Sequence, residues 1–195
     1  MPLVPPVELV AQARLGNVVS FPTDTVPALG VRPENSEQIY ALKQRATDKP
    51  LILMAATLQE LEPFLTAQAL QESDWSRITA QYWPGALTLV LPASDRLPLA
   101  MNPKGDKTIG VRVPALTWAR EILSETGPLA TTSANLSGQP PLTTQTVIAQ
   151  AFPTVFTLDC GDQNHLPLGN NQPSTVAQWT GKQWQILRSS QIQLV

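Results

Sequence analysis

A short apolar run, Pro128-Leu129-Ala130, leads directly into Thr131-Thr132-Ser133-Ala134-Asn135-Leu136-Ser137-Gly138. The apolar run predicts a strand, and the hydroxyl-rich residues predict a loop at its carboxyl end, where open α/β sheets place ligand crevices. Small hydroxyl and amide side chains with exposed backbone N–H groups suit the oxygens of a phosphate. The same residues are typical of an ordinary turn, so the rest of the chain must decide between the two.

The composition limits what this loop can belong to. The chain has 195 residues and is 43% hydrophobic, which predicts a single domain over residues 1–195 with a sizeable core. A formal net charge of −2 gives no general attraction for nucleic acid, so RNA binding would need a local basic patch. With one cysteine and one histidine, neither an internal disulfide nor a multi-histidine metal site is expected, and we predict no protein-bound metal.

The sequence shows neither a membrane span nor an export signal. No apolar run approaches the roughly 20 residues that span a bilayer. The first residues, Met1-Pro2-Leu3-Val4-Pro5-Pro6, lack the basic start and small-residue cleavage site of a signal peptide. A cytoplasmic protein that does not bind membranes is therefore expected.

Helical and strand patterns are mixed along the chain. Helices are expected over residues 7–15, 36–45, from 57 onward, 73–82, 117–124 and 145–151, with Ser36, Thr57 and Ser73 as caps. Strands are expected over residues 18–21, 51–54, 87–91, 108–113, 129–132, 155–158, 175–179 and 183–187. This mixture predicts an α/β domain. A hairpin at Thr180-Gly181-Lys182 favours a mixed sheet over a wholly parallel one.

The chemistry has to rest on a short list of groups. The sequence holds no GxGxxG, no GxxxxGK[ST] and no serine in a GxSxG turn. What remains is hydroxyls, backbone amides, lysines and arginines. That set suits phosphoryl or nucleotidyl transfer, in which positioning and charge stabilisation do most of the catalysis.

Positive charges lie at three places that could meet a phosphate. Lys43, Arg45 and Lys49 fall within seven residues at a predicted helix end. Arginine matches phosphate oxygens bidentately, and lysine acts as a point charge. The alternative is that basic residues complement the carboxyl end of the helix dipole. That alternative explains one of the three residues well and the other two poorly. Arg112 lies in an otherwise apolar strand, where ligand contact is favoured over a structural ion pair, and Arg188 ends the last strand.

Two further strands adjoin polar clusters. Thr23-Asp24-Thr25 follows a predicted strand, and Pro173-Ser174 opens another. Asp24 fits a turn that it caps through its own backbone, while the two threonines could line a cleft. The side chain of Asn135, in the first loop, is expected to face a ligand rather than the core.

Six short motifs then occur in a fixed order. They are Pro22-Thr23-Asp24-Thr25-Val26, Lys43-x-Arg45 with Lys49-Pro50-Leu51, Trp83-Pro84-Gly85-Ala86-Leu87-Thr88, Val111-Arg112-Val113-Pro114, Thr132-Ser133-Ala134-Asn135-Leu136-Ser137-Gly138 and Pro173-Ser174-Thr175-Val176. Each is weak alone, but together they resemble the YrdC-type family, whose well-known members are L-threonylcarbamoyladenylate synthases. The resemblance covers residues 22–188.

The resemblance implies a twisted mixed α/β sheet with helices packed on it and a concave basic cleft. It also implies a nucleotidyltransferase that converts L-threonine, bicarbonate (or CO2) and ATP into threonylcarbamoyl-AMP and pyrophosphate, with Mg²⁺ carried by the nucleotide. Partner proteins of the family then transfer the threonylcarbamoyl group to adenosine 37 of tRNAs that read codons starting with A. Weak tRNA binding would be compatible with this role.

The resemblance assigns the family's catalytic and binding roles to the residues of this chain that match its motifs. Lys43 and Arg45 would be catalytic and hold the ATP phosphates. The wider substrate- and ATP-binding set would be Thr23, Thr25, Lys43, Arg45, Lys49, Thr108, Arg112, Ser133, Asn135, Ser174 and Arg188. Within it, the resemblance assigns Thr23, Thr25 and Ser174 to the threonine side and Arg188 to the nucleotide.

The sequence departs from the family after the first motif. Pro27-Ala28 stands where the family usually has an aromatic residue and glycine. Proline fixes φ and lacks an N–H, so the amino-acid half of the site is expected to differ while the ATP half keeps its motifs. Two alternatives therefore stay open. One is a non-catalytic RNA-binding paralogue, and the other is a related ligase that activates a different amino acid.

Overall fold

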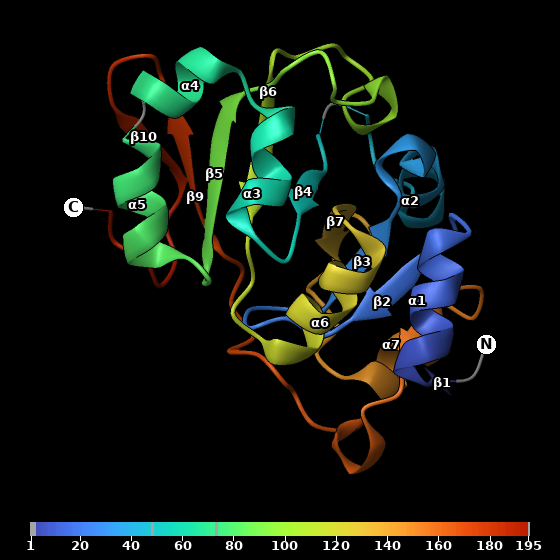
Figure 1. Ribbon diagram of the computed structural model, residues 1–195. Coiled ribbons are helices and arrows are strands. Elements are labelled where there is room, and N and C mark those ends of the chain that lie inside the picture. Colours follow the sequence, from blue (N-terminus) through green and yellow to red (C-terminus); the bar gives the residue numbers. More distant parts are fainter. Residues whose placement is uncertain (1–2, 48, 73, 195) are drawn as a thin grey trace.

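The computed structural model describes residues 3–47, 49–72 and 74–194, in which one mixed sheet runs through the whole molecule (Figure 1). Its strands follow the order β1-β8-β2-β3-β7-β4-β6-β5-β9-β10. They are β1 (Leu3–Val4), β2 (Val19–Phe21), β3 (Ala28–Val31), β4 (Ile52–Met54), β5 (Leu87–Pro92), β6 (Thr108–Arg112), β7 (Leu129–Ser133), β8 (Phe156–Leu158), β9 (Thr175–Trp179) and β10 (Trp184–Arg188). The α/β fold class is confirmed.

Seven α-helices accompany the sheet in the described residues. They are α1 (Pro6–Arg14), α2 (Glu37–Lys43), α3 (Leu58–Leu61), α4 (Ala67–Glu72), α5 (Trp75–Tyr82), α6 (Thr117–Thr126) and α7 (Gln145–Ala151). Four short 3₁₀ turns are η1 (Pro33–Asn35), η2 (Glu62–Phe64), η3 (Leu99–Met101) and η4 (Gly161–Gln163). The expected capping box at Thr57 and Glu60 is present at α3. The expected cap of α5, Ser73, lies outside the described residues.

The expected cap of α2 is wrong. The Ser36 hydroxyl donates to the Pro33 carbonyl oxygen at 2.7 Å and accepts no bond from the helix. The helix ends at Lys43 rather than at Arg45, because Gln44 adopts a left-handed conformation with φ of 50°. Arg45 therefore begins a loop instead of ending the helix.

The sequence missed β1, β3 and α4. β3 follows Pro27 and contains Gly30, which together are typical of a turn rather than a strand. Glycine gives close packing there, because a Cβ on Gly30 would lie 3.1 Å from the ring of Phe21, which would have to shift slightly. All four residues of β3 are buried between β2 and β7.

Strand directions confirm a mixed sheet. β2 pairs with β3, β3 with β7, β7 with β4, and β6 with β5 in antiparallel fashion. β4 runs parallel to β6, and β5 runs parallel to β9. The expected hairpin joins β9 and β10 as an antiparallel pair.

The two faces of the sheet are covered unequally. Because side chains alternate along a strand, Leu53 points to one face while Ile52 and Met54 point to the other. The Leu53 face packs against α2, α3, α4, α5 and α7 in the larger core cluster. The Met54 face packs against α1 and α6, which contact each other, in a smaller cluster. No helix in the described parts of the chain is both long and apolar enough to cross a membrane.

Candidate functional site

A polar pocket of about 260 Å³ lies on the Met54 face of the sheet, beside the part that α1 and α6 cover. Cross-strand partners form its base. These pairs are Ala28 with Ser133, Ile52 with Thr131, Met54 with Arg112, and Thr88 with Val176. The sequence predicted a crevice at strand carboxyl ends. Ser133 and Arg112 do end strands, but Ile52 and Thr88 lie near strand starts, so the pocket extends over the face of the sheet.

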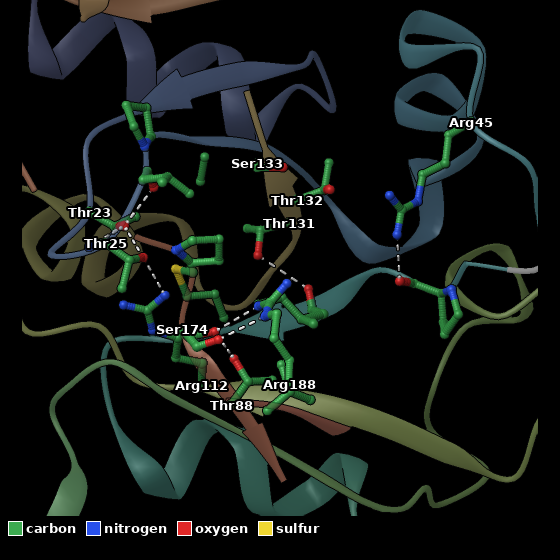
Figure 2. A pocket seen from close by; sticks show the side chains of 18 residues that line it. Thr23, Thr25, Arg45, Thr88, Arg112, Thr131, Thr132, Ser133, Ser174 and Arg188 are labelled. Atoms are coloured by element: carbon green, nitrogen blue, oxygen red, sulfur yellow. Dashed lines mark hydrogen bonds between the residues drawn. The ribbon is translucent and has the colours of Figure 1, made fainter. Parts of the chain in front are cut away.

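One wall is the loop of residues 22–27, which joins β2 and β3. The Thr23 hydroxyl donates to the Val26 carbonyl oxygen at 2.7 Å and accepts from the Thr25 backbone N–H at 3.1 Å. The two threonine hydroxyl oxygens lie 3.0 Å apart, and both side chains line the pocket. Figure 2 shows them on the opposite side of the pocket from Arg45. The expected cleft position of Thr23 and Thr25 agrees with this geometry.

Arg112 holds this wall to the sheet. Its Nη1 donates to Thr25 Oγ1 at 2.7 Å and its Nε donates to the Gly85 carbonyl oxygen at 3.0 Å. Its Nη2 lies 2.8 Å from Asp24 Oδ1, as an ion pair without hydrogen-bond geometry. Burial lowers the pKa of Arg112, the negative charge of Asp24 opposes that effect, and Arg188 adds to it.

The ion pair changes the interpretation of Arg112 and Asp24. The sequence favoured ligand contact over a structural ion pair for Arg112, and the structure contains that ion pair. Asp24 Oδ1 also accepts the backbone N–H of Ala115 at 2.9 Å, so this carboxylate bridges two segments instead of capping its own turn. Arg112 still lines the pocket, where a ligand oxygen would compete with its protein partners.

Ser174 and Arg188 form a second wall. Arg188 Nε donates to the Ser174 carbonyl oxygen at 2.9 Å, and its Nη2 donates to Ser174 Oγ at 3.3 Å. The Ser174 hydroxyl lies 2.8 Å from that of Thr88. Burial lowers the pKa of Arg188. The structure thus brings two residues that are 14 apart in sequence into direct contact at the pocket. The sequence predicts each of them as a binding residue but does not predict their contact.

The loop after α2 supplies the third arginine of the pocket. Arg45 lines it, with Nε donating to the Lys49 carbonyl oxygen at 2.9 Å and Nη2 to that of Pro50 at 3.2 Å. Lys49 is exposed and is absent from the pocket lining. Thr108 begins β6, at the opposite end of that strand from Arg112, and it is also absent from the lining. Of the residues predicted to bind phosphate, Arg45 therefore lines the pocket, whereas Lys49 and Thr108 do not.

Lys43 lies behind the pocket rather than in its lining. It is 1% exposed, and its Nζ donates to the carbonyl oxygen of Ser133 and, at 3.2 Å, to Asn135 Oδ1. Burial, and secondly the like charge of Arg45, lower its pKa to about 7. An ammonium group has three N–H donors, and these bonds use two of them; one acceptor, Ser133, lines the pocket.

The expectation that the Asn135 side chain faces a ligand is wrong. Its Nδ2 donates to the carbonyl oxygens of Leu136 at 2.8 Å and Gln139 at 2.7 Å. Its Oδ1 accepts from Ser133 Oγ at 2.5 Å and from Lys43. The amide therefore uses all its donors to hold the loop after β7, and the neighbouring Ser133 is the loop residue that reaches the pocket.

Asn135→Ala is accordingly expected to lower the free energy of unfolding by about 1–3 kcal/mol, because it removes the amide donors to the partly buried Leu136 and Gln139 carbonyl oxygens and the side-chain acceptor of buried Lys43. Urea unfolding measures this change. Ser137→Ala, in the same loop with an exposed side chain, is the matched control and should stay within about 0.5 kcal/mol of wild type. Equal stability of the two variants would contradict the structural role of the Asn135 amide.

Several residues that shape the pocket stand outside the predicted binding set. Thr88, Thr131, Ile52, Met54 and Pro173 all line it. Thr88 and Pro173 were quoted only within motifs, while Ile52 and Met54 were expected to be wholly buried in a strand. Strand alternation marks residues that share a face, but only the strand order shows which of those faces adjoin.

The lining of this pocket carries Arg45, Arg112 and Arg188 and no aspartate, glutamate, histidine or cysteine. No group of three or more histidine, cysteine or acidic residues suited to a metal ion occurs in the described part of the chain. Hydroxyls and guanidinium groups without carboxylates suit an anionic ligand. Fold and site together define a class of α/β proteins with an arginine-lined polar pocket on one face of a mixed sheet.

The chain belongs to the Sua5/YciO/YrdC family, whose model, described as "Telomere recombination", matches residues 11–190. This confirms the YrdC-type resemblance. The threonylcarbamoyl-AMP synthase of Vibrio vulnificus is 41% identical over 136 residues, which are 68% of this chain and 72% of that protein. The synthase of Vibrio campbellii is 35% identical over 178 residues, 89% of this chain and 92% of its own.

A solved structure shows the same fold. The crystal structure of Pyrococcus abyssi Sua5 complexed with L-threonine matches 94% of this chain with a TM-score of 0.80 and 29% sequence identity. This chain spans about half of that protein, 53% of its length. The neighbour therefore supports the fold over nearly the whole chain described here.

Proposed function

We propose that the chain makes threonylcarbamoyl-AMP from L-threonine, bicarbonate (or CO2) and ATP, with release of pyrophosphate. The observation that carries the proposal is the pocket, in which Thr23, Thr25, Ser133 and Ser174, all from motifs of the family, meet three arginines on one sheet face. Relatives that share 41% and 35% identity over most of the chain carry the same activity in their names. The enzyme is accordingly a nucleotidyltransferase with ATP as a substrate.

The residues fit the chemistry. The threonine amine and bicarbonate give a carbamate and water (with CO2, a carbamate and a proton), and the carbamate oxygen attacks the α-phosphorus of ATP while the bond to pyrophosphate breaks. A carbamate oxygen is already nucleophilic, so the pocket needs no strong general base. Arg45 and Lys43, with Mg²⁺ carried by the nucleotide, would neutralise charge on the leaving pyrophosphate. Holding the substrates in line supplies much of the rate.

The pocket divides into two halves in this proposal. The nucleotide occupies the side of Arg45 and Ser133, and L-threonine occupies the side of Thr23 and Thr25, which lies across the pocket (Figure 2). Arg112 bonds to the loop of Thr23 and Thr25, and Arg188 bonds to Ser174 in the second wall. Lys49, Thr108 and Asn135 stay in the proposed binding set only as supports, because none of the three lines the pocket.

The product would serve tRNA modification. Partner proteins that transfer the threonylcarbamoyl group to adenosine 37, a cytoplasmic location and weak tRNA binding belong to this proposal. The single domain over residues 1–195 stays a prediction.

The test is pyrophosphate release from ATP and bicarbonate across a panel of amino acids. L-threonine should give the highest rate, and the adduct should have the mass of threonylcarbamoyl-AMP. A second candidate, a ligase for another amino acid, is favoured by Pro27 and Ala28, which line the pocket next in sequence to the loop of Thr23 and Thr25. A different best substrate would support that candidate. Tight, salt-dependent RNA binding without turnover of any amino acid would indicate the RNA-binding alternative.

Arg45→Ala is expected to weaken ATP binding by about 1.5–3 kcal/mol, the range for a hydrogen bond to a charged group. Calorimetry with ATP measures the effect. The control is Lys49→Ala, which removes a neighbouring charge that is absent from the pocket lining and should change ATP affinity far less. Unchanged ATP affinity in a folded Arg45→Ala protein would mean that Arg45 bonds to its own loop and does not bind ATP.

A further inference from the structure

Three consecutive residues, 169–171, lie against the backbone of the loop that carries Thr23 and Thr25. The Asn170 backbone N–H donates to the Asp24 carbonyl oxygen at 3.1 Å, and that of Asn171 donates to the Thr25 carbonyl oxygen at 3.0 Å. We call residues 169–171 the clasp. These bonds hold the outer side of the loop, while the threonine hydroxyls on its inner side face the pocket.

Gly169 allows this approach. A Cβ built on Gly169 would lie 2.3 Å from the Thr25 carbonyl oxygen and 2.5 Å from that of Thr23. Both neighbours are backbone atoms, which cannot rotate away as the end of a flexible side chain can. Its φ lies outside the left-handed region, unlike that of Gly105, which has nothing within 4 Å. Gly169 is therefore required because the Thr23 and Thr25 carbonyl oxygens lie too close for a Cβ, and not because its backbone conformation is unusual.

The clasp also leads into the second wall of the pocket. Two residues after it, Pro173 and Ser174 line the pocket, and Ser174 receives the Arg188 guanidinium. On the other side, the loop that it holds presents Thr25 Oγ1 and Asp24 to Arg112. The two backbone bonds of the clasp thus connect the two walls of the pocket. In the sequence, Asp24 in the first wall and Ser174 in the second are 150 residues apart.

We propose that the clasp is a positioning element for the amino-acid half of the site, with Gly169 as its essential residue. It fixes the distance of Thr23 and Thr25 from Arg112 without touching substrate itself. Arg45 belongs to the loop after α2, so its side of the pocket depends on the clasp least, whereas Ser133 is linked to the clasped loop through its cross-strand partner Ala28. The inference rests on the proposed function for its substrate assignment.

Gly169→Ala is the direct test, read in the pyrophosphate-release assay. The KM for L-threonine should rise roughly tenfold or more, because displaced binding groups lose their alignment, while the KM for ATP changes far less. KM does not depend on the fraction of protein that is folded, so partial misfolding cannot imitate this split. Equal rises of both KM values, or wild-type values for both, would overturn the proposal.

Two control variants isolate the backbone contact. Gly105→Ala makes the same chemical change in an exposed loop outside the pocket lining, where the φ of 72° strains an alanine, so it controls for lost stability and should leave both KM values at the wild-type level. Gln191→Ala removes the side-chain partner of Asn170, whose Nδ2 donates to Gln191 Oε1 at 2.6 Å, and keeps the backbone bonds. A rise in the KM for L-threonine in Gln191→Ala equal to that in Gly169→Ala would overturn the role of Gly169.

Amide hydrogen exchange tests the clasp without any assay of activity. The Thr25 N–H is bonded within the loop to Thr23 Oγ1, so its exchange should quicken in Gly169→Ala while that of Val111 in β6 is unchanged. Unchanged exchange at Thr25 would overturn the clasp. A wild-type protein that releases no pyrophosphate would instead overturn the proposed function, and the exchange result would still decide on the clasp.

Discussion

Replacing Lys43 with methionine is expected to lower kcat/KM for ATP about a hundredfold or more, the typical loss for a group that stabilises developing negative charge. Lys43 Nζ lies within bonding distance of Ser133 and Asn135, in a position that is 1% exposed. Methionine has a similar length and keeps the packing, but it can neither hold these two acceptors nor offer a donor to a phosphate. Steady-state kinetics with ATP as the varied substrate measures the effect.

The pH dependence distinguishes a charged lysine from a merely well-packed one. Since burial and Arg45 lower the pKa of Lys43 to about 7, the free enzyme loses this charge as the pH rises above that value. The kcat/KM of wild type should therefore fall above about pH 7, and that of Lys43→Met should not. Arg45→Gln removes the like charge that contributes to the lowered pKa, so the fall should move to higher pH. A wild-type profile that is flat to pH 9 would contradict the assignment.

The same lysine links stability to pH, with a sign that can be worked out. Between pH 7 and the ordinary value of 10.5, the unfolded state keeps a proton that folded Lys43 has released. The free energy of unfolding should thus rise with pH in this window, by at most about 1.4 kcal/mol per unit, and level off below pH 7. Urea unfolding of wild type and Lys43→Met at several pH values isolates the effect. Parallel curves would contradict it.

Most regular elements could be predicted from the sequence because their signals are local. The capping box of α3 and the turn before β10 depend on residues within a few positions of each other. β3 could not be predicted this way, since Pro27 and Gly30 read as a turn and the strand exists only because β2 and β7 enclose it. Its burial is a tertiary effect that overrides local preference.

In the site, too, features with local sequence signals could be predicted and those that depend on tertiary packing could not. Residues in dense polar motifs, such as Thr23, Ser133 and Ser174, were found and do line the pocket. Their partners were not found, because the contact of Asp24 with Arg112 joins residues 88 apart. Gly169 carries no motif at all, and its importance is visible only from the carbonyl oxygens that face it. Sequence patterns identify polar chemistry, whereas packing decides which groups meet.

The ion pair between Arg112 and Asp24 gives the second large effect. Arg112→Met is expected to lower the free energy of unfolding by about 3–5 kcal/mol, the usual cost of removing one partner of a buried pair. The side chains are 4% and 17% exposed, so water can replace little of the lost interaction. The bonds to Thr25 Oγ1 and the Gly85 carbonyl oxygen are lost as well. Denaturant unfolding measures the change.

A double-mutant cycle separates the pair from these other bonds. Asp24→Asn keeps an oxygen that can accept the Ala115 N–H but removes the negative charge, so Arg112 is left buried with a neutral partner. In the double variant neither charge remains uncompensated. The double variant should therefore be about 1–3 kcal/mol more stable than the sum of the two single effects predicts. The bonds of Arg112 to Thr25 and Gly85 are absent in both Arg112→Met proteins and cancel. Simple additivity would mean that Arg112 is held by its hydrogen bonds alone, and that Asp24 serves the loop only through Ala115.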